Sequence, residues 1–538
     1  MAFTGPMATA ARADDKPATC DPYQDYSCLD AYLGEDFFTR LANYYKLEMG
    51  QPGPPSDPNA PPSRRDYWPG TPQTSPPMPF TEWPQGGVTS IGVTRPGSVD
   101  SPFMVAMGNT SFGEWLNDRG IQIYGWVDPG GNMSTASVKP GGNWPAAYLY
   151  VPNRVDLEQA VIYIDRFPDT VQTDHVDWGI RLSAIYGTNY RYTTSYGVAS
   201  YQLLKDNDPY GYDFPMVWGE LYFPQIAEGS DLRLGRYISI PDTEAQLAPN
   251  NYMSTHSITY TFDNYTNEGL IDTTAVTKNL QITAAISVGT EAAVWHEGGM
   301  ASLTNLYPNT PLTPNPLYPG KKFAKDPGSL PSASFCVRWS SDSGDDTFYP
   351  CLDGINKGTW GYNNLQWYGG TYYHKFSDSW HITFEVYDEH ENKVPNLRNP
   401  LVQTIFANGG TPFSPQFTPF NGPNMAYCKT TTQLDCHAES TGYVSYLNWE
   451  HDPLNNVSFR WEFYDDHEGQ RTGTRARYVD LGIGWQHWLS PQFEFRPEVT
   501  WYRSIGADAF NGNFNASPPI APNRNYLVEG SMDAILHF

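Results

Sequence analysis

The C-terminal part of the chain, residues 441–538, alternates between apolar and polar positions. Residues 457–464 read VSFRWEFY and residues 493–502 read FEFRPEVTWY. Because successive residues of a β-strand point to opposite faces, this alternation predicts strands with one apolar, aromatic face and one charged face. The segment 526–538 continues the pattern and ends at Phe538. The charged face carries Arg460, Glu462, Glu494, Arg496, Glu498, Glu529 and Asp533.

Two architectures use strands of this kind. In a soluble sandwich the apolar face meets a second sheet, whereas in a transmembrane barrel it meets lipid and the charged face lines a wet lumen. A solvated outer face of a sandwich accounts for any single strand. Over many strands with Trp on the opposite face, a water-filled lumen explains the charges better, because a soluble core would desolvate them at a high cost.

The same pattern predicts about sixteen strands in an all-β, antiparallel transmembrane barrel. These segments are 120–127, 157–166, 176–186, 216–223, 231–240, 257–262, 269–276, 280–288, 334–340, 365–374, 380–387, 443–449, 457–464, 477–488, 493–502 and 526–538.

The connections between these segments alternate in length. Short ones lie near 167–169, 277–279, 376–379, 452–456 and 489–492, and long ones at 188–215, 290–332, 341–363, 389–440 and 504–525. Short turns at one end and long loops at the other are typical of outer-membrane barrels. A sandwich or propeller has no reason to alternate in this way.

The N-terminal part has a different organisation. An Ala-Arg-Ala sequence at 11–13 resembles a cleavage site, so we interpret 1–13 as the remnant of a signal peptide. Residues 14–50 form a short helical segment, since Leu33, Phe37, Leu41 and Tyr44 recur at helical spacing. Residues 51–114 are a proline-rich linker and loop, and residues 115–538 are the barrel.

Composition supports a barrel in an envelope membrane. Aromatic residues make up 15% of the chain although its mean hydropathy is -0.52, and membrane barrels place Trp and Tyr at both interfaces. The net charge of -25 argues against a nucleic-acid partner, which would require a basic face.

Six cysteines fall into three close pairs, which predicts local disulfides and an oxidising compartment. The pairs are Cys20 with Cys28, Cys336 with Cys351, and Cys428 with Cys436. Tighter CxxC spacing, which a zinc site would use, does not occur in the sequence.

Candidate chemistry is sparse. The sequence contains no recognisable catalytic motif, so we expect neither enzymatic activity, nor a cofactor, nor a metal site. The residues expected to line the pore or its constriction are Arg181, Glu220, Arg233, Arg236, Glu244, His381, Glu385, Arg460 and Arg496. The polar segment 233–257 contains two prolines, and its chemistry fits a constriction loop inside the lumen and an outward surface loop equally well.

Several segments carry a family resemblance. GRYISIPD at 235–242, APNNY at 248–252, STHS at 254–257, YGWVDPGGN at 124–132 and DWGIR at 177–181 are similar to the OmpL-like β-barrel porins of bacterial outer membranes. Residues 363–366 and 372–376 resemble the same family, and the resemblance covers roughly 115–538. It implies a β-barrel, a cell outer membrane location and solute passage, and it leaves the substrate unassigned.

We therefore expect a porin that lets small hydrophilic solutes or ions diffuse passively. The alternatives are a soluble secreted carbohydrate-binding β-sheet protein and an outer-membrane barrel enzyme. Expected partners are outer-membrane lipid and the barrel-assembly machinery, with Phe538 as the assembly signal. The sequence leaves a homotrimer and a periplasmic partner of the N-terminal segment open.

Overall fold

The computed structural model describes residues 22, 28–49 and 101–538, except 147, 196–197, 203–207, 239, 265, 291–292, 294–329, 361–363, 408–424, 453, 514–517 and 519. Six α-helices lie in these residues: α1 (Leu29–Leu33), α2 (Phe37–Glu48), α3 (Pro102–Met107), α4 (Ser111–Asn117), α5 (Ile258–Thr261) and α6 (Pro400–Ala407). None of them is long and apolar enough to cross a membrane.

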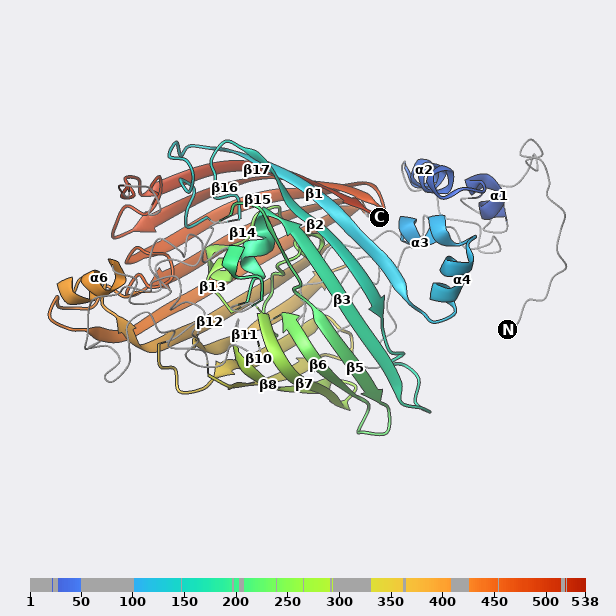
Figure 1. Cartoon of the computed structure of the whole chain (residues 1–538), viewed down its shortest axis with the longest axis horizontal. Helices are drawn as coiled ribbons and strands as arrows, with labels where there is room; N and C mark the ends of the chain where they lie inside the picture. The colour runs from blue at the N-terminus through green and yellow to red at the C-terminus, as the bar shows by residue number, and fades with distance from the viewer. Residues whose placement is uncertain are drawn as a thin grey trace.

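The strands of the described residues form one antiparallel sheet that closes into a barrel (Figure 1). They are β1 (Gln122–Ser134), β2 (Val155–Arg166), β3 (Asp177–Gly187), β4 (Gly211–Asp213), β5 (Val217–Phe223), β6 (Ser230–Ile238), β7 (Thr266–Thr277), β8 (Leu280–Thr290), β9 (Ser332–Ser340), β10 (Asp346–Ile355), β11 (Gln366–Ser377), β12 (Trp380–Pro395), β13 (Asp435–Asp452), β14 (Asn455–Asp466), β15 (Ala476–Ser490), β16 (Phe493–Ile505) and β17 (Tyr526–His537).

Pairing of the first and last strands closes the barrel. Trp126 of β1 stands opposite His537 of β17, and β1 pairs with β2 on its other side. The short β4 pairs with the end of β3, and β5 pairs with the rest of β3, so β4 and β5 share one position in the wall. The seventeen described strands therefore make a sixteen-position wall, which confirms the predicted architecture.

Two strand predictions are wrong, and the errors offset each other in the count. Residues 257–262 alternate like a strand, but Ser257 caps the short helix α5 through a 2.9 Å hydrogen bond from the Tyr260 amide. The missed wall position is β10, which the prediction placed in the long loop 341–363; the short β4 was also missed, within the connection 188–215. Strand β10 contains Pro350, a residue that is uncommon inside a strand because proline cannot donate to the ladder.

The wall has the reverse polarity of a soluble β protein. On β14, β16 and β17 the charged residues predicted to share one face are all buried. Their apolar neighbours are exposed instead, with exposed fractions of 37% for Phe459, 54% for Val499 and 51% for Met532. The apolar face therefore meets lipid and the charged face meets the lumen, as the alternation predicted.

The N-terminal helices stand at the end of the barrel where the chain terminates (Figure 1). Asp36 caps α2 by accepting a 3.1 Å hydrogen bond from the Thr39 amide, and the Tyr45 hydroxyl donates to the His537 carbonyl at 2.7 Å. Helix α3 and the start of α4 occupy residues for which the sequence predicted a linker or loop, and α4 continues into the range predicted as barrel. The predicted signal remnant 1–13 and linker residues 51–100 lie outside the described residues.

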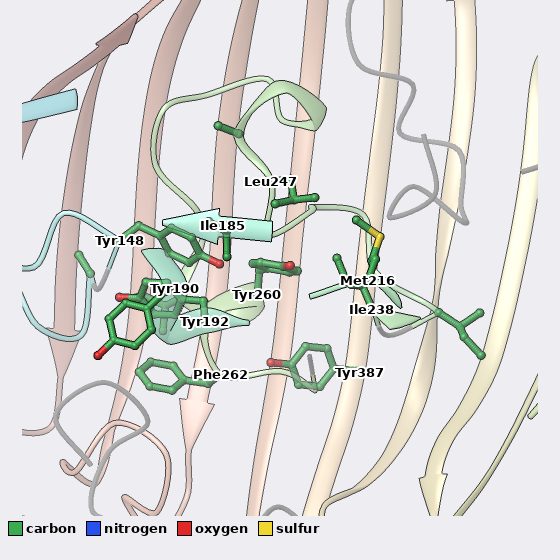
Figure 2. Packing of buried hydrophobic residues seen from close by; sticks show 14 of the residues in the cluster. Tyr148, Ile185, Tyr190, Tyr192, Met216, Ile238, Leu247, Tyr260, Phe262 and Tyr387 are labelled. Atoms are coloured by element: carbon green, nitrogen blue, oxygen red, sulfur yellow. The ribbon is translucent and has the colours of Figure 1, made fainter. Parts of the chain in front are cut away.

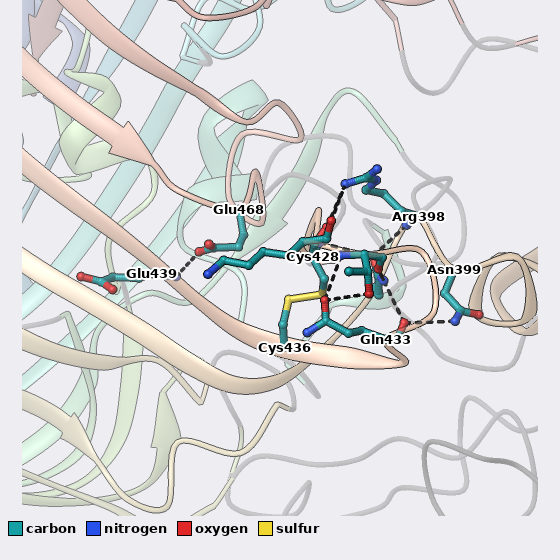
Figure 3. The surroundings of a disulfide bond; sticks show 10 residues. Arg398, Asn399, Cys428, Gln433, Cys436, Glu439 and Glu468 are labelled. Carbon is teal, nitrogen blue, oxygen red and sulfur yellow. Dashed lines mark hydrogen bonds between the residues drawn. A yellow bond between two sulfur atoms is a disulfide. The ribbon is translucent and has the colours of Figure 1, made fainter.

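Two of the three predicted disulfides are present. Cys336 and Cys351 face each other across β9 and β10. Cys428 bonds Cys436, which fastens the connection before β13 to that strand (Figure 3). Cys28 is also disulfide-bonded, and its predicted partner Cys20 lies outside the described residues.

The connection between β6 and β7 folds into the barrel. We call residues 240–264 the inner loop, and every one of them is buried. It includes α5, which lies against β13 and β14 on another part of the wall. Tyr260 and Phe262 of this loop gather inside the barrel with Tyr148, Tyr190 and Tyr192 from two other inward-folded connections (Figure 2).

Phe538 lies at the closing seam. Its amide donates to the Gly125 carbonyl at 2.8 Å, and a Cβ added at Gly125 would meet the Phe538 ring at 2.7 Å, so the ring covers that glycine. We expect Phe538→Asp to give a several-fold lower yield of folded barrel in membranes, because a charge replaces the ring at the seam. Heat-modifiable mobility on a gel measures this yield. Phe538→Tyr keeps the ring and is the control; equal yields for Phe538→Asp and wild type would contradict the role.

Candidate functional site

The inner loop is held by charged side chains of the barrel wall. Arg460 of β14 donates to the Thr255 carbonyl at 3.1 Å and pairs with Asp480 at 3.0 Å. Both side chains of this ion pair are fully buried. A buried guanidinium needs both charge compensation and hydrogen-bond acceptors, and here the Asp480 carboxylate supplies the opposite charge while the Thr255 carbonyl of the loop is an acceptor.

Strand β16 supplies two further anchors. Arg496 donates to the Asn251 carbonyl at 2.8 Å and also to the Ala248 carbonyl, while it pairs with Asp533 of β17. Glu498 accepts the Thr255 amide at 2.9 Å. Wall charges of both signs therefore hold the loop, since arginines bind its carbonyls and carboxylates bind its amides.

Strand β12 holds the same loop from another part of the wall. Glu385 accepts the Thr243 amide at 2.6 Å, and His381 shares a 2.7 Å hydrogen bond with the Tyr252 hydroxyl. Because β6 and β12 are separated by β7 to β11 in the wall, the loop bridges strands that do not neighbour each other. It lies across the lumen, where a constriction would form.

Glu244 lies within the inner loop itself. Its carboxylate accepts the Ser257 amide at 3.1 Å and also the Ser257 hydroxyl. Burial raises the pKa of Glu244 to about 7, while Arg460 and the hydrogen bonds from Ser257 act in the opposite direction. Glu244 therefore changes its charge near neutral pH.

His256 is the other titratable group of this loop. Burial lowers its pKa to about 3, so the ring is neutral at physiological pH. Its Nε2–H donates to the Ala245 carbonyl at 2.6 Å. The ring also stacks on Tyr148, with centroids 3.6 Å apart. His256 therefore fixes the turn of the loop through packing rather than through charge.

The remaining predicted residues form a second group on β3, β5 and β6. Arg181 pairs with Asp165 at 2.8 Å, and Arg233 pairs with Glu220 and with Asp231. These pairs are buried on the inner side of the wall, next to Trp218, whose ring faces both guanidinium groups.

Arg236 holds a different inward segment. It pairs with Asp213 at 2.9 Å and donates to the Thr193 carbonyl and, at 3.0 Å, to the Ser195 hydroxyl. The structure thus brings five predicted residues together at the inner loop, namely Glu244, His381, Glu385, Arg460 and Arg496. Arg181, Glu220, Arg233 and Arg236 lie apart from them.

Several residues at the inner loop were absent from the predicted site, among them Glu498 and three others. Glu462 accepts the Ile258 amide at 2.8 Å, Arg471 donates to the Phe262 carbonyl at 3.0 Å, and Gln159 donates to the Gln246 carbonyl at 2.9 Å. Glu462 follows the strand alternation and could have been selected on that ground. Arg471 lies in a connection and Gln159 at a strand irregularity, so neither position carries a periodic signal.

The comparison with known families decides the class of protein. A sequence profile of the family described as "Putative beta-barrel porin-2, OmpL-like" matches residues 120–538. The chain belongs to this family. It is an outer-membrane porin channel, which confirms the predicted family, location and class of function and does not favour a soluble carbohydrate-binding protein.

Solved structures are similar to this porin at low identity. The anion-selective porin from Comamonas acidovorans has a TM-score of 0.44 at 8% identity, over 78% of this chain and 99% of that chain. The outer membrane channel DcaP of Acinetobacter baumannii has a TM-score of 0.42 at 8% identity, over 78% of this chain and 97% of that chain. The trimer form of OmpT from Vibrio cholerae has a TM-score of 0.39 at 8% identity, over 78% of this chain and 99% of that chain. None of the curated proteins matches the sequence.

Removing an anchor of the inner loop should destabilise the barrel. We expect Arg496→Ala to cost about 3–5 kcal/mol, because it leaves the carboxylate of Asp533 buried without its partner. Urea titration followed by heat-modifiable mobility measures the change. Arg503→Ala removes an exposed arginine from the same strand and is the control. An equal effect of both substitutions would contradict the anchoring role.

Glu244 should make the stability of the porin depend on pH. Because its pKa in the native state is about 7, above its ordinary value of 4.5, its stabilising contribution is complete below about pH 4.5 and is lost as pH rises through 7. We expect the unfolding temperature to fall between about pH 4.5 and 7, and Glu244→Gln to reduce this fall. Glu228→Gln in an exposed turn is the control; identical pH profiles for wild type and Glu244→Gln would refute the assignment.

Proposed function

We propose that this porin passes small hydrophilic solutes by diffusion and prefers cations, with the inner loop as its constriction. The observation that carries the proposal is the charge inside the barrel. Among the described residues from 120 onwards, twenty-one Asp and Glu side chains are buried but only seven Arg side chains are. Acidic linings favour cations in channels.

The buried arginines leave much of this negative charge uncompensated. Six of them pair with wall carboxylates, as Arg181 does with Asp165 and Arg471 with Glu389. Asp128 of β1 is fully buried, and neither of its carboxylate oxygens has a hydrogen-bond partner. The net charge of -25 for the whole chain has the same sign and would raise the local concentration of cations at the mouths.

The test is a reversal potential across a planar lipid bilayer under a KCl gradient. We expect discrete conductance steps and a potential of cation-preferring sign. Asp128→Asn with Glu158→Gln should reduce that preference, since both carboxylates are buried on β1 and β2. Asp508→Asn in an exposed loop is the control. An anion-preferring potential in the wild type, or no difference between the two variants, would overturn the proposal.

The assembly state and further partners stay predictions. A homotrimer would be recognised from the mass of the detergent-purified porin measured by light scattering. The helices α1 to α4 stand beside the C-terminus of the barrel, at its short-turn end, which is the end that outer-membrane barrels direct to the periplasm. We infer that a periplasmic partner would meet this helical segment. We further propose that the barrel acts as a channel without catalysis.

A further inference from the structure

The barrel wall contains a groove beside two of its short strands. Strand β5 has 7 residues and β6 has 9, whereas β12 has 16. A cavity of about 750 Å³ opens beside β5 and β6, and we call it the wall groove. Its lining includes Leu182, Ala184, Val217 and Leu234 of the wall and Phe214 of the connection before β5. The volume lies in the range of about 300–1,000 Å³ that is typical of sites for small ligands.

The wall groove lies on the lipid-facing side of the barrel. Leu182, Val217 and Leu234 are exposed, and Leu234 reaches an exposed fraction of 65%. The residues next to two of them in the chain, Arg181 and Arg233, are buried on the inner side of the wall. Because successive residues of a strand point to opposite faces, the groove opens toward lipid and not toward the lumen.

Aromatic side chains place the wall groove at the depth of lipid chains. Trp178 and Tyr186 are exposed near the two ends of β3, and the exposed Tyr212 stands opposite Tyr186 in the strand register. Trp and Tyr occupy both membrane interfaces of a barrel, so Leu182 lies between the two headgroup levels. The Tyr186 end of β3 continues into the long connection 188–215, so this end belongs to the outer leaflet.

Hydrocarbon suits the wall groove better than water or protein does. The lining is almost entirely apolar, whereas a buried water needs about two to four polar partners. The outer wall of a second copy would be convex, so it would pass over the recess instead of filling it. A lipid chain needs no polar partner and reaches the groove directly from the bilayer.

Arg236 adds one polar contact to this apolar lining. It lines the groove although it is only 4% exposed. Its terminal nitrogens donate to the Asp213 carboxylate at 2.9 Å, the Phe214 carbonyl at 2.6 Å and the Ser195 hydroxyl at 3.0 Å. Its Nε–H has no hydrogen-bond partner among the described residues. A buried donor without a partner is costly, so this group indicates an acceptor that a ligand supplies.

The surroundings of Arg236 select the kind of acceptor. Asp213 already balances the positive charge, so the remaining Nε–H suits a neutral oxygen rather than a second anion. Arg236 bonds Phe214, which follows Tyr212 by two residues, so the guanidinium lies close to the headgroup level of the outer leaflet. Membrane lipids carry a neutral oxygen of this kind just below the headgroup, where an ester or amide joins the acyl chain.

We propose that the wall groove holds one acyl chain of an outer-leaflet lipid, whose ester or amide carbonyl accepts the Arg236 Nε–H. Lipid hydrocarbon is as apolar as the groove, so the chain is retained by close packing and by this hydrogen bond rather than by the hydrophobic effect. The bound chain thickens the wall where β5 and β6 are short. The proposal does not depend on the solute preference of the channel.

Retention of a labelled lipid by the full-length porin tests the proposal. The porin is reconstituted into vesicles of ¹⁴C-labelled palmitoyl-oleoyl phosphatidylcholine, extracted with detergent and washed. We expect a single phospholipid per chain to stay bound. Ala184→Phe places a ring in the groove and should lower retention several-fold. Ala284→Phe is the matched control and should retain lipid like the wild type, because Ala284 is exposed on the lipid-facing side of β8 outside the lining.

Two further variants separate the parts of the proposal. Val217→Phe also fills the groove and should lower retention. Arg236→Lys keeps a positive charge for Asp213 but lacks the Nε–H, so it should lower retention without filling the space. Heat-modifiable mobility shows which variants fold, and only folded variants are compared.

Three results would overturn the proposal. They are no retained phospholipid in the wild type, equal retention in Ala284→Phe and both filling variants, and unchanged retention in Arg236→Lys. A fall in the mass of the detergent-purified porin on Ala184→Phe, with lipid retention unchanged, would show that a second copy covers the groove and would also overturn it. None of these readouts uses conductance, so a failure of the proposed solute preference would be recognised separately.

Discussion

The structure depends on satisfying charged groups that the membrane forces to the inside of the barrel. Lipid takes the apolar face of each strand, so arginines and carboxylates such as Arg460, Arg496 and Glu498 must find partners in the lumen. Part of that requirement is met by ion pairs along the wall, and part by the backbone of the inner loop. The loop in turn has amides and carbonyls that a buried connection could not leave unpaired. The wall charges and the polar backbone of the inner loop therefore satisfy each other's hydrogen-bonding requirement inside the barrel.

Strand alternation was enough to predict the architecture, because a barrel wall with lipid outside and water inside imposes a period of two on each strand. It failed where local sequence and tertiary setting disagree. Residues 257–262 carry a strand pattern, yet Ser257 and Glu462 cap them as a helical turn. Residues 346–355 form a strand despite Pro350, because the pairing with β9 and β11 continues on both sides of the proline.

The candidate site was predictable only in part. Arg460, Arg496, His381 and Glu385 could be selected because strand position alone places them on the lumen face. Their contacts with the inner loop could not be predicted, because each partner in that loop lies more than a hundred residues away along the chain, as Asn251 does from Arg496 with a separation of 245. The carboxylates of Asp242, Asp263 and Glu385 show the same limit, because they have no motif spacing and only the closed barrel brings them together.

The position of the inner loop along the chain has a consequence for biogenesis. Loop residues 240–264 are synthesised before all of β12 to β17, which carry most of their anchors. In a partly assembled sheet this segment would therefore lack most of its anchoring contacts. The loop can reach its final position only after the C-terminal half of the wall has formed. The constriction proposed above would then form late in maturation, so a chain that stalls during assembly would have a wider and less selective opening than the finished molecule. Because contacts this distant in sequence form slowly, the interval in which such an opening exists depends on the rate at which the last strands close the wall.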